Sequence, residues 1–262
     1  MQPAILNFLE RDVFKNIVLL KMLHAYGDYM EQHFMQTAEG TGLLLLLPTQ
    51  VSYYDATTYP QTKYVVLFST DNLEATQTLF DHIPTDCNLI FKLMDEAVKG
   101  KLASIFPLQR VTSFLSYTSR PESCFVPDPE VHITHTVDEA SLTMYESQGH
   151  PRATVQRQFA DGEAIHFSFY QQEKPVSLCF TYRNYDKVWE IGGVWSDPAQ
   201  RRKGYARRVV ATALHTLTQK QRTPRYQVHE TNRASIQLAE SLGLIRFVEI
   251  EHFLAKTKVL TE

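Results

Sequence analysis

The feature that most limits the fold is a stretch in which an apolar strand, a short basic turn and an amphipathic helix follow one another. Val188–Trp195 is predicted to form the strand and Gly204–Gln219 the helix, and five basic residues lie within Arg201–Arg208. A helix N-terminus presents unpaired backbone N–H groups and the positive end of the helix dipole. A glycine and a small residue in the turn would let those amides approach a ligand closely. The pattern therefore predicts an anion site suited to a pyrophosphate.

The length of the chain, 262 residues, exceeds a typical single domain of roughly 100–200 residues, so a boundary is expected. Residues that interrupt regular structure gather at Ser119–Ser123 and again at Val126–Pro129. We place the boundary there, which predicts one domain over residues 1–125 and a second over residues 126–262. With 44% hydrophobic residues, the composition is that of a globular protein.

The second domain is predicted to be an α/β (α+β) fold with a mixed, mostly antiparallel sheet flanked by helices. Three strand-like stretches separated by turn-like breaks indicate an antiparallel meander in its middle. In order, the expected elements are a strand at Val131–Thr134, helices at Asp138–Tyr145 and Val155–Asp161, strands at Ala164–Tyr170, Pro175–Tyr182 and Val188–Trp195, a helix at Gly204–Gln219, a strand at Tyr226–Glu230, a helix at Ala234–Leu242 and a strand at Phe247–Leu254.

Two motifs in the second half resemble those of the GNAT superfamily of N-acetyltransferases. The first, Arg201-Arg202-Lys203-Gly204-Tyr205-Ala206, fits the family pattern of Gln or Arg, two residues, Gly, one residue, then Gly or Ala. The second has Asn232 and a small residue before a helix that closes at Leu242-Gly243-Leu244, where the family most often has Phe in place of Leu244. The order of elements from Val131 to Leu254 also matches the GNAT arrangement.

The resemblance implies acetyl-CoA as co-substrate and assigns the residues that would bind it. In the family, the strand before the basic turn splays from its neighbour and offers free backbone amides to the pantetheine and the thioester oxygen. The residues at matching positions are Val194 and Trp195 on the strand, Arg201, Arg202, Lys203, Gly204, Tyr205 and Ala206 in the turn, and Asn232 and Ser235 at the second motif. A glycine pair in mid-strand, Gly192-Gly193, weakens a strand and predicts a bulge or a close approach.

Catalytic candidates are fewer. Glu190 lies fourteen residues before Gly204, where several family members have a glutamate as general base, although a strand glutamate also commonly faces solvent or pairs with a cation. Many members have a tyrosine as acid one position after the leucine that matches Leu238, and here Ala239 stands in its place. His229 lies at the end of a predicted strand and is a second catalytic candidate. A packed or hydrogen-bonded histidine is an equally good interpretation of this position.

Composition limits the partners. Lys and Arg number 26 against 29 for Asp and Glu, a formal charge of -3, and no wider basic stripe indicates a nucleic acid. The three cysteines are scattered and His132 and His135 have no companions, so we expect no metal. The longest aliphatic run, Leu43–Leu47, cannot cross a membrane. With no secretion signal at the start, the expected location is the cytoplasm.

The first domain carries no motif of its own. Its helices and short apolar runs, with strands expected at Leu43–Leu47, Val51–Tyr54 and Tyr64–Phe68, fit an α/β domain. Some two-part GNAT proteins, including the glycine N-acyltransferase-like branch, begin with a degenerate copy of the fold, and Phe8–Ile17 is faintly similar to them. By that resemblance, this domain would lie on the acceptor side.

The expected function is acetyl-CoA-dependent acetylation of the amine of a small molecule or an amino acid, by a monomer or homodimer. One alternative is a non-catalytic acyl-CoA binding or sensing protein, which the missing acid at Ala239 motivates. A second is a peptide or protein N-acetyltransferase.

Overall fold

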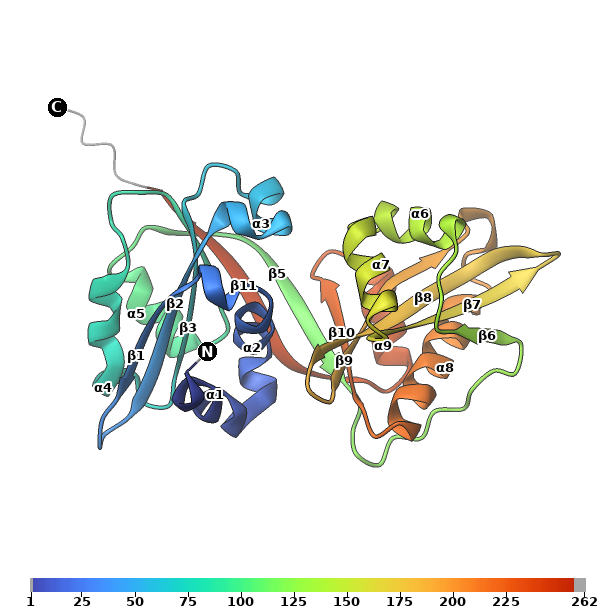
Figure 1. Ribbon diagram of the computed structural model, residues 1–262, viewed down its shortest axis with the longest axis horizontal. Helices are drawn as coiled ribbons and strands as arrows, with labels where there is room; N and C mark the ends of the chain where they lie inside the picture. The colour runs from blue at the N-terminus through green and yellow to red at the C-terminus, as the bar shows by residue number, and fades with distance from the viewer. Residues whose placement is uncertain (1, 257–262) are drawn as a thin grey trace. The chain divides into compact units, whose positions relative to one another are not determined.

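The computed structural model describes residues 2–256, which divide into two compact units. The residues up to Phe114 and those from Val248 onward form the first unit, and Leu115–Phe247 form the second. This division differs from a boundary at residues 125 and 126, because the last strand, β11 (Ile245–Ala255), pairs with a strand of the first unit from Glu251 to Ala255. The chain passes between the units in β5 (Leu108–Thr118) and again in β11 (Figure 1).

The first unit is a mixed sheet with strand order β1-β2-β3-β4-β11. β1, β2 and β3 are antiparallel neighbours, β3 is parallel to β4, and β11 is antiparallel to β4. The elements before β5 are the helices α1 (Pro3–Leu9), α2 (Val13–Tyr26), α3 (Tyr53–Thr58), α4 (Leu73–Thr76) and α5 (Glu96–Ala103), the strands β1 (Glu31–Gln36), β2 (Thr41–Pro48), β3 (Tyr64–Thr70) and β4 (Leu89–Leu93), and 3-10 turns at Glu10–Asp12, Gly27–Tyr29, Thr49–Val51 and Gln77–His82.

The aliphatic run Leu43–Leu47 lies in β2, where all five leucines are buried. Such a run is expected when helices cover both faces of a sheet, since alternating residues then have no solvent side to face. Leu44 and Leu46 pack in one core with Leu79 and Leu102, and α1 and α2 lie on the opposite side of the sheet (Figure 1).

One expectation for the first unit is wrong, and one strand of it was not foreseen. The run Val51–Tyr54 is not a strand: Ser52 caps α3 by accepting a hydrogen bond from the backbone N–H of Asp55, and the chain turns into a helix. The hydroxyl of Ser52 therefore decides the local structure in spite of the apolar neighbours. The strand β1 was missed because Glu31–Gln36 has no apolar alternation and lies half-buried at the sheet edge.

The second unit contains every strand and helix predicted for the second half before the last strand, with ends shifted by at most three residues. Its sheet has the order β10-β9-β8-β7-β6, antiparallel except for the parallel pair β9 and β10. The elements are β6 (Val131–Thr134), α6 (Glu139–Ser147), α7 (Arg152–Ala160), β7 (Ala164–Gln171), β8 (Lys174–Tyr185), β9 (Val188–Ser196), a 3-10 turn at Pro198–Gln200, α8 (Tyr205–Gln219), β10 (Thr223–His229) and α9 (Arg233–Ser241).

Helices cover both faces of this sheet (Figure 1). On one face, α8 buries Val209, Ala213 and Leu217 in a core that includes Phe167 and Ile191 of the sheet. On the other face, α6 and α7 pack against β8, and their core contains Leu142, Tyr145, Val155, Phe159, Leu178, Phe180 and Tyr182. The face with α6 and α7 is also the one toward which Glu190 points, because it pairs with Tyr182 across β8 and β9.

The two units repeat one strand arrangement. In each, two helices precede three antiparallel strands, and a helical crossover then leads to a strand parallel to the third: β1-β2-β3-β4 in the first unit and β7-β8-β9-β10 in the second. The first unit is therefore a second copy of the fold, as expected for its α/β class. Across residues 2–256, no helix is long and apolar enough to cross a membrane.

Candidate functional site

A cavity of about 440 Å³ opens at the N-terminus of α8 in the second unit. Three segments supply its walls: the end of β9, the basic turn that follows it, and the start of α9, which lies about 30 residues further along the chain. They bring together nine of the ten residues predicted to bind the co-substrate, namely Val194, Trp195, Arg201, Arg202, Gly204, Tyr205, Ala206, Asn232 and Ser235. The tenth, Lys203, is not in the cavity wall, and its Nζ donates a hydrogen bond to Gln200 Oε1 at 2.7 Å.

The basic turn has a backbone that only a few sequences adopt. Arg202 and Gly204 both have positive φ, 63° and 83°, so the turn twice enters the left-handed region. Gly204 is the N-cap of α8 and supplies no side-chain hydrogen bond to the first turn. A Cβ at Gly204 would meet no atom within 4 Å, so the space beside this residue is open. The first N–H groups of α8 are thus available to a ligand from the cavity.

The basic side chains of the turn differ in their polar partners. Arg207 donates to the backbone oxygen of Ser241 at 2.6 Å, and Arg208 pairs with Asp128 and Glu130. These contacts fix α8 to its neighbours. Arg202, in contrast, has no polar side-chain partner among residues 2–256, although it lies in the cavity wall. Its positive charge is available to an anion bound at the helix.

The end of β9 carries a bulge. Leu178 of β8 lies opposite Trp195 and Phe180 lies opposite Gly192, so β9 has one residue more than β8 over this stretch. On its other side, β9 pairs with β10 as far as Ile191, which lies opposite Tyr226. Both strands continue beyond these two residues. Beyond Ile191 the two strands separate, which leaves backbone groups of β9 facing the cavity. This is the splayed strand that the sequence predicted.

The glycine pair of β9 makes room for two aromatic rings. A Cβ on Gly192 would lie 3.0 Å from Cε1 of His150, and a Cβ on Gly193 would lie 2.4 Å from Cδ1 of Tyr145. Gly193 also has a φ of 61°, and its N–H donates a hydrogen bond to Nε2 of His150 at 2.9 Å. The glycines therefore serve both the bulge and a close approach, and the approaching groups are side chains of the chain itself.

Glu190 is buried and engaged at both carboxylate oxygens. Oε1 accepts a hydrogen bond from the Tyr182 hydroxyl at 2.6 Å, and Oε2 pairs with Arg225 at 2.7 Å. The guanidinium of Arg225, which is 1% exposed, also donates to Asn184 and Ser116. Burial and the Glu190 charge raise the pKa of Tyr182 well above its ordinary value, so this hydroxyl stays protonated. Glu190 thus belongs to a buried ionic network and is absent from the cavity wall.

The second motif contributes capping and a neutral hydroxyl pair. Asn232 caps α9 by accepting from the N–H of Ser235 at 3.1 Å, and the Ser235 hydroxyl bonds that of Tyr226 at 2.9 Å. Burial raises the pKa of Tyr226 to about 12. His229 lies outside the cavity wall, and its Nδ1 contacts the Thr231 hydroxyl at 2.8 Å. Ala239 is fully buried, so this position presents no proton donor.

Sequence reasoning missed His150, Tyr145 and Arg225. Arg225 lies one position before the predicted strand Tyr226–Glu230, and only the register of β9 and β10 places it beside Glu190. His150 did carry a local signal, since it stands between Gly149 and Pro151, two residues that fix the backbone between two helices.

A second cavity of about 520 Å³ lies on the β6–β7 side of the same unit and includes His166 and Asp138 in its wall. It is larger, but none of the predicted residues lies in it. It also lacks an uncapped helix N-terminus, since Asp138 caps α6. We therefore place the functional site at α8. In the described part of the chain, no group of His, Cys, Asp and Glu side chains could hold a metal ion.

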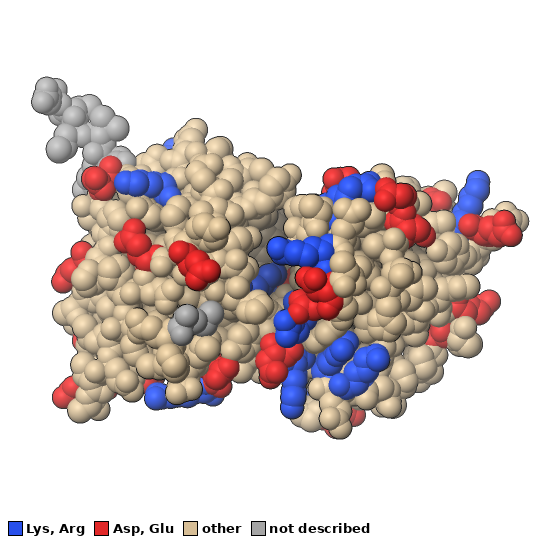
Figure 2. Space-filling model, in the orientation of Figure 1, with Lys and Arg blue, Asp and Glu red and all other residues tan. Residues whose placement is uncertain are grey.

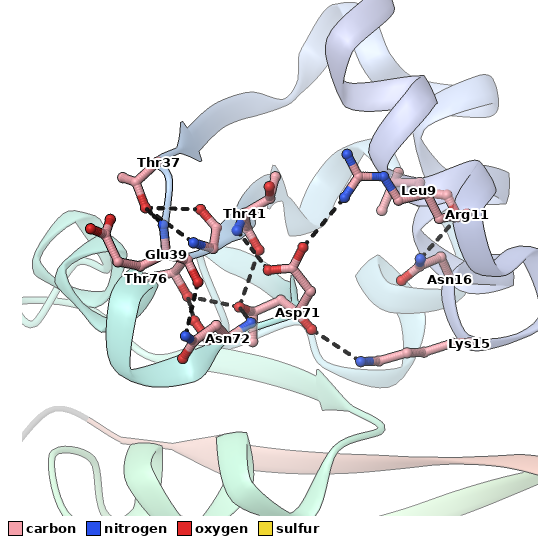
Figure 3. A network of polar contacts seen from close by, with 12 residues as sticks. Leu9, Arg11, Lys15, Asn16, Thr37, Glu39, Thr41, Asp71, Asn72 and Thr76 are labelled. Carbon is pink, nitrogen blue, oxygen red and sulfur yellow. Dashed lines mark hydrogen bonds and ion pairs between the residues drawn. The ribbon is translucent and has the colours of Figure 1, made fainter.

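The equivalent junction of the first unit, from β3 to α4, is closed by its own side chains (Figure 3). The Asp71 carboxylate accepts a hydrogen bond from the backbone N–H of Thr41 at 2.6 Å and forms an ion pair with Arg11 at 3.4 Å. Asn72 caps α4, a helix of only four residues. A carboxylate thus occupies the place where the second unit has open amides and positive charge, and it disfavours a bound anion.

Comparison with known proteins agrees with this geometry. Residues 133–244 match the model of the acetyltransferase (GNAT) family. The match spans the bulged strand, the basic turn and the second motif, so it identifies a GNAT acetyltransferase domain over residues 133–244. A GNAT acetyltransferase domain implies acyl transfer from acetyl-CoA. No curated protein matches the sequence.

Several solved structures share the fold over nearly the whole chain. A GNAT-family acetyltransferase from Colwellia psychrerythraea is 11% identical with a TM-score of 0.61, covering 94% of this chain and 97% of its own. A GCN5-related N-acetyltransferase from Kribbella flavida is 16% identical with a TM-score of 0.59, covering 93% and 95%. A tandem GNAT protein from the clavulanic acid biosynthesis pathway is 9% identical with a TM-score of 0.51, covering 92% and 88%. Because both chains are covered, the likeness in fold extends over both units of this chain.

Proposed function

We propose that this protein transfers an acetyl group from acetyl-CoA to the amine of a small molecule or an amino acid. The observation that carries the proposal is the convergence of three separate segments on one cavity around an uncapped helix N-terminus. Acidic groups in the first turn of a helix are favourable, whereas α8 has none there and begins with two arginines after a glycine that offers no side-chain cap. Such a helix end is consistent with a polyanionic ligand.

Each part of the cavity wall would bind a different part of the co-substrate. The pyrophosphate would accept hydrogen bonds from the first N–H groups of α8, with Arg201 and Arg202 beside it. Asn232 and Ser235, at the start of α9, would border the pantetheine arm. The bulge in β9 would place the thioester near Gly193, Val194 and Trp195, where backbone amides can stabilise the developing negative charge on its oxygen.

A small acceptor is the finer part of the proposal. Gln148 and Trp195 lie in the cavity wall next to the bulge, and the rings of His150 and Tyr145 pack against the glycines of the bulge just outside that wall. A cavity of about 440 Å³ that also has to hold part of the co-substrate suits a compact amine better than a folded protein.

The experiment compares two glycines in titrations of the protein with acetyl-CoA by calorimetry. Gly204→Val puts a side chain in front of the α8 amides and forces a β-branched residue to a φ of 83°. We expect affinity for acetyl-CoA to fall about 100-fold or more, which is about 2.7 kcal/mol of binding free energy.

The matched control is Gly162→Val. Gly162 also has a positive φ, 71°, with no atom within 4 Å of a Cβ, but it lies after α7 and outside the cavity wall. This variant carries the same kind of backbone strain and should keep the wild-type affinity, with one acetyl-CoA per chain. Equal affinities in Gly204→Val and wild type would refute the pyrophosphate assignment.

A further inference from the structure

The imidazole of His150 lies at the centre of the β9 bulge. Its Nε2 accepts the N–H of Gly193 at 2.9 Å, and its ring packs edge-on against Phe180 with centroids 5.1 Å apart. Gly192 lets the ring come this close, because a Cβ there would lie 3.0 Å from Cε1. No other residue type at position 192 would leave the same room.

The backbone holds His150 in place from both sides. Gly149 has a φ of 85° and ends α6, and the N–H of His150 then bonds the backbone oxygen of Tyr145 at 3.1 Å. Pro151 is the N-cap of α7, so the next helix begins directly. Because the backbone of His150 is fixed between two helix ends, its side chain loses little further conformational entropy when it contacts a ligand.

The hydrogen bond also defines the tautomer. An N–H donor requires a lone pair on its acceptor, so Nε2 of His150 carries no proton and Nδ1 does. A ligand oxygen that takes the Gly193 N–H would leave this lone pair unoccupied within a few ångströms of the ligand. The imidazole would then be a base directly beside the atom that reacts.

Charged and titratable groups surround His150 on several elements. Tyr182 on β8 has its ring centroid 6.4 Å away and donates a hydrogen bond to Glu190 on β9, which forms an ion pair with Arg225 on β10. On α6 and α7, Glu146 pairs with Arg152, and Tyr145 lies against Gly193. The anionic groups here are thus paired with arginines, and His150 is the imidazole at the bulge.

We propose that His150 is the general base of the acyl transfer, an inference that rests on the proposed function. The thioester oxygen takes the Gly193 N–H, and Nε2 of His150 receives the proton that the attacking neutral amine loses. The bond between nitrogen and the acetyl carbon forms, and the bond between that carbon and sulfur breaks. His150 then returns the proton to the coenzyme A thiolate, so that the cycle ends with a neutral imidazole, an amide and a free thiol.

This assignment also accounts for the buried Ala239. One imidazole that takes a proton from the amine and gives it to the sulfur needs no separate tyrosine acid. Glu190, with both oxygens engaged, is assigned to holding the network of Tyr182 and Arg225.

The first test needs no acceptor. In protein labelled with ¹⁵N at its histidines, the His150 Nε2 signal, identified by its absence in His150→Gln, should shift when acetyl-CoA is added, together with the Gly193 amide. The ratio of wild-type to His150→Gln affinity for acetyl-CoA should stay within about twofold. Binding of acetyl-CoA with an unmoved His150 signal would overturn the proposal and leave the cavity assignment intact. No binding at all would instead refute the proposed function, and His150 with it.

The second test is the pH–rate profile of the acetylation, measured with an amine that wild type accepts. His150→Gln should lower kcat by about 100-fold or more, lose the acidic limb of the profile, and regain part of its rate with added imidazole. Glu190→Gln should keep that limb. The exposed His135 provides the control, since His135→Gln should match wild type. An acidic limb retained in His150→Gln, or lost in Glu190→Gln, would contradict the assignment.

Discussion

At the scale of single residues, His166 is a buried imidazole whose chemistry the acyl transfer does not use. Its Nδ1 contacts the Tyr145 hydroxyl at 2.6 Å, and its Nε2 has no hydrogen-bond partner within the described chain. Burial lowers its pKa from 6.5 to about 4, with a smaller opposing effect of the Asp138 charge. The folded protein therefore holds His166 neutral at any pH near neutrality.

This shift predicts a pH dependence of stability. Between pH 6.5 and about 4 the unfolded chain protonates His166 while the folded chain does not, so the free energy of unfolding should fall as the pH decreases through this window. The loss from this group should be about 3 kcal/mol, and it should level off below about pH 4. Urea unfolding at several pH values, for wild type and His166→Gln, measures it. Identical slopes in the two proteins would show that His166 does not titrate in this way.

At the scale of elements, β9 combines a bulge, a splayed end and a buried ion pair in nine residues. The pair of Glu190 and Arg225 joins β9 to β10 just before the two strands separate at Ile191. When one partner of a buried ion pair is removed, the other charge remains buried without compensation. This lowers the free energy of unfolding far more than the loss of a surface ion pair does. The ion pair thus fixes the point from which the strands diverge.

We expect Glu190→Gln to lower the free energy of unfolding by about 3 kcal/mol, because Arg225 would lose its buried counter-charge. The control is Glu139→Gln, which breaks the exposed pair with Arg152 and should cost less than about 1 kcal/mol. Chemical denaturation at neutral pH compares them. Equal losses in the two variants would mean that the buried pair contributes no more than a surface contact.

The elements that could be predicted from the sequence are those with local causes. The basic turn, its glycine and the amphipathic α8 are consecutive in sequence, so their meeting at one site follows from the chain itself. The prediction of a strand at Val51–Tyr54 was wrong because the hydroxyl of Ser52 caps a helix there, and this outweighs a short apolar run. The role of Glu190 could not be predicted, since its partner Arg225 lies 35 positions away and is defined only by strand register.

At the scale of the whole molecule, residues 2–256 contain the same strand arrangement twice, and within them the candidate site lies in the second copy. The second unit has an open, basic helix N-terminus, whereas the first has Asp71 hydrogen-bonded at the matching junction (Figure 3). This is why one acetyl-CoA per chain is expected. On the face drawn in Figure 2, Lys and Arg side chains of the second unit are interspersed with Asp and Glu, in agreement with the net charge of -3. The positive charge that matters is local to the turn.

The most direct measurement of the central claim is the release of coenzyme A thiol from acetyl-CoA in the presence of a broad panel of small amines and amino acids. Mass spectrometry of the same reactions identifies any acetylated product. We predict that at least one amine gives thiol and acetylated amine in equal amounts, and that Gly204→Val abolishes both. Tight binding of acetyl-CoA with no amine-dependent thiol release across the panel would contradict the account and would leave a protein that binds acyl-CoA without turning it over.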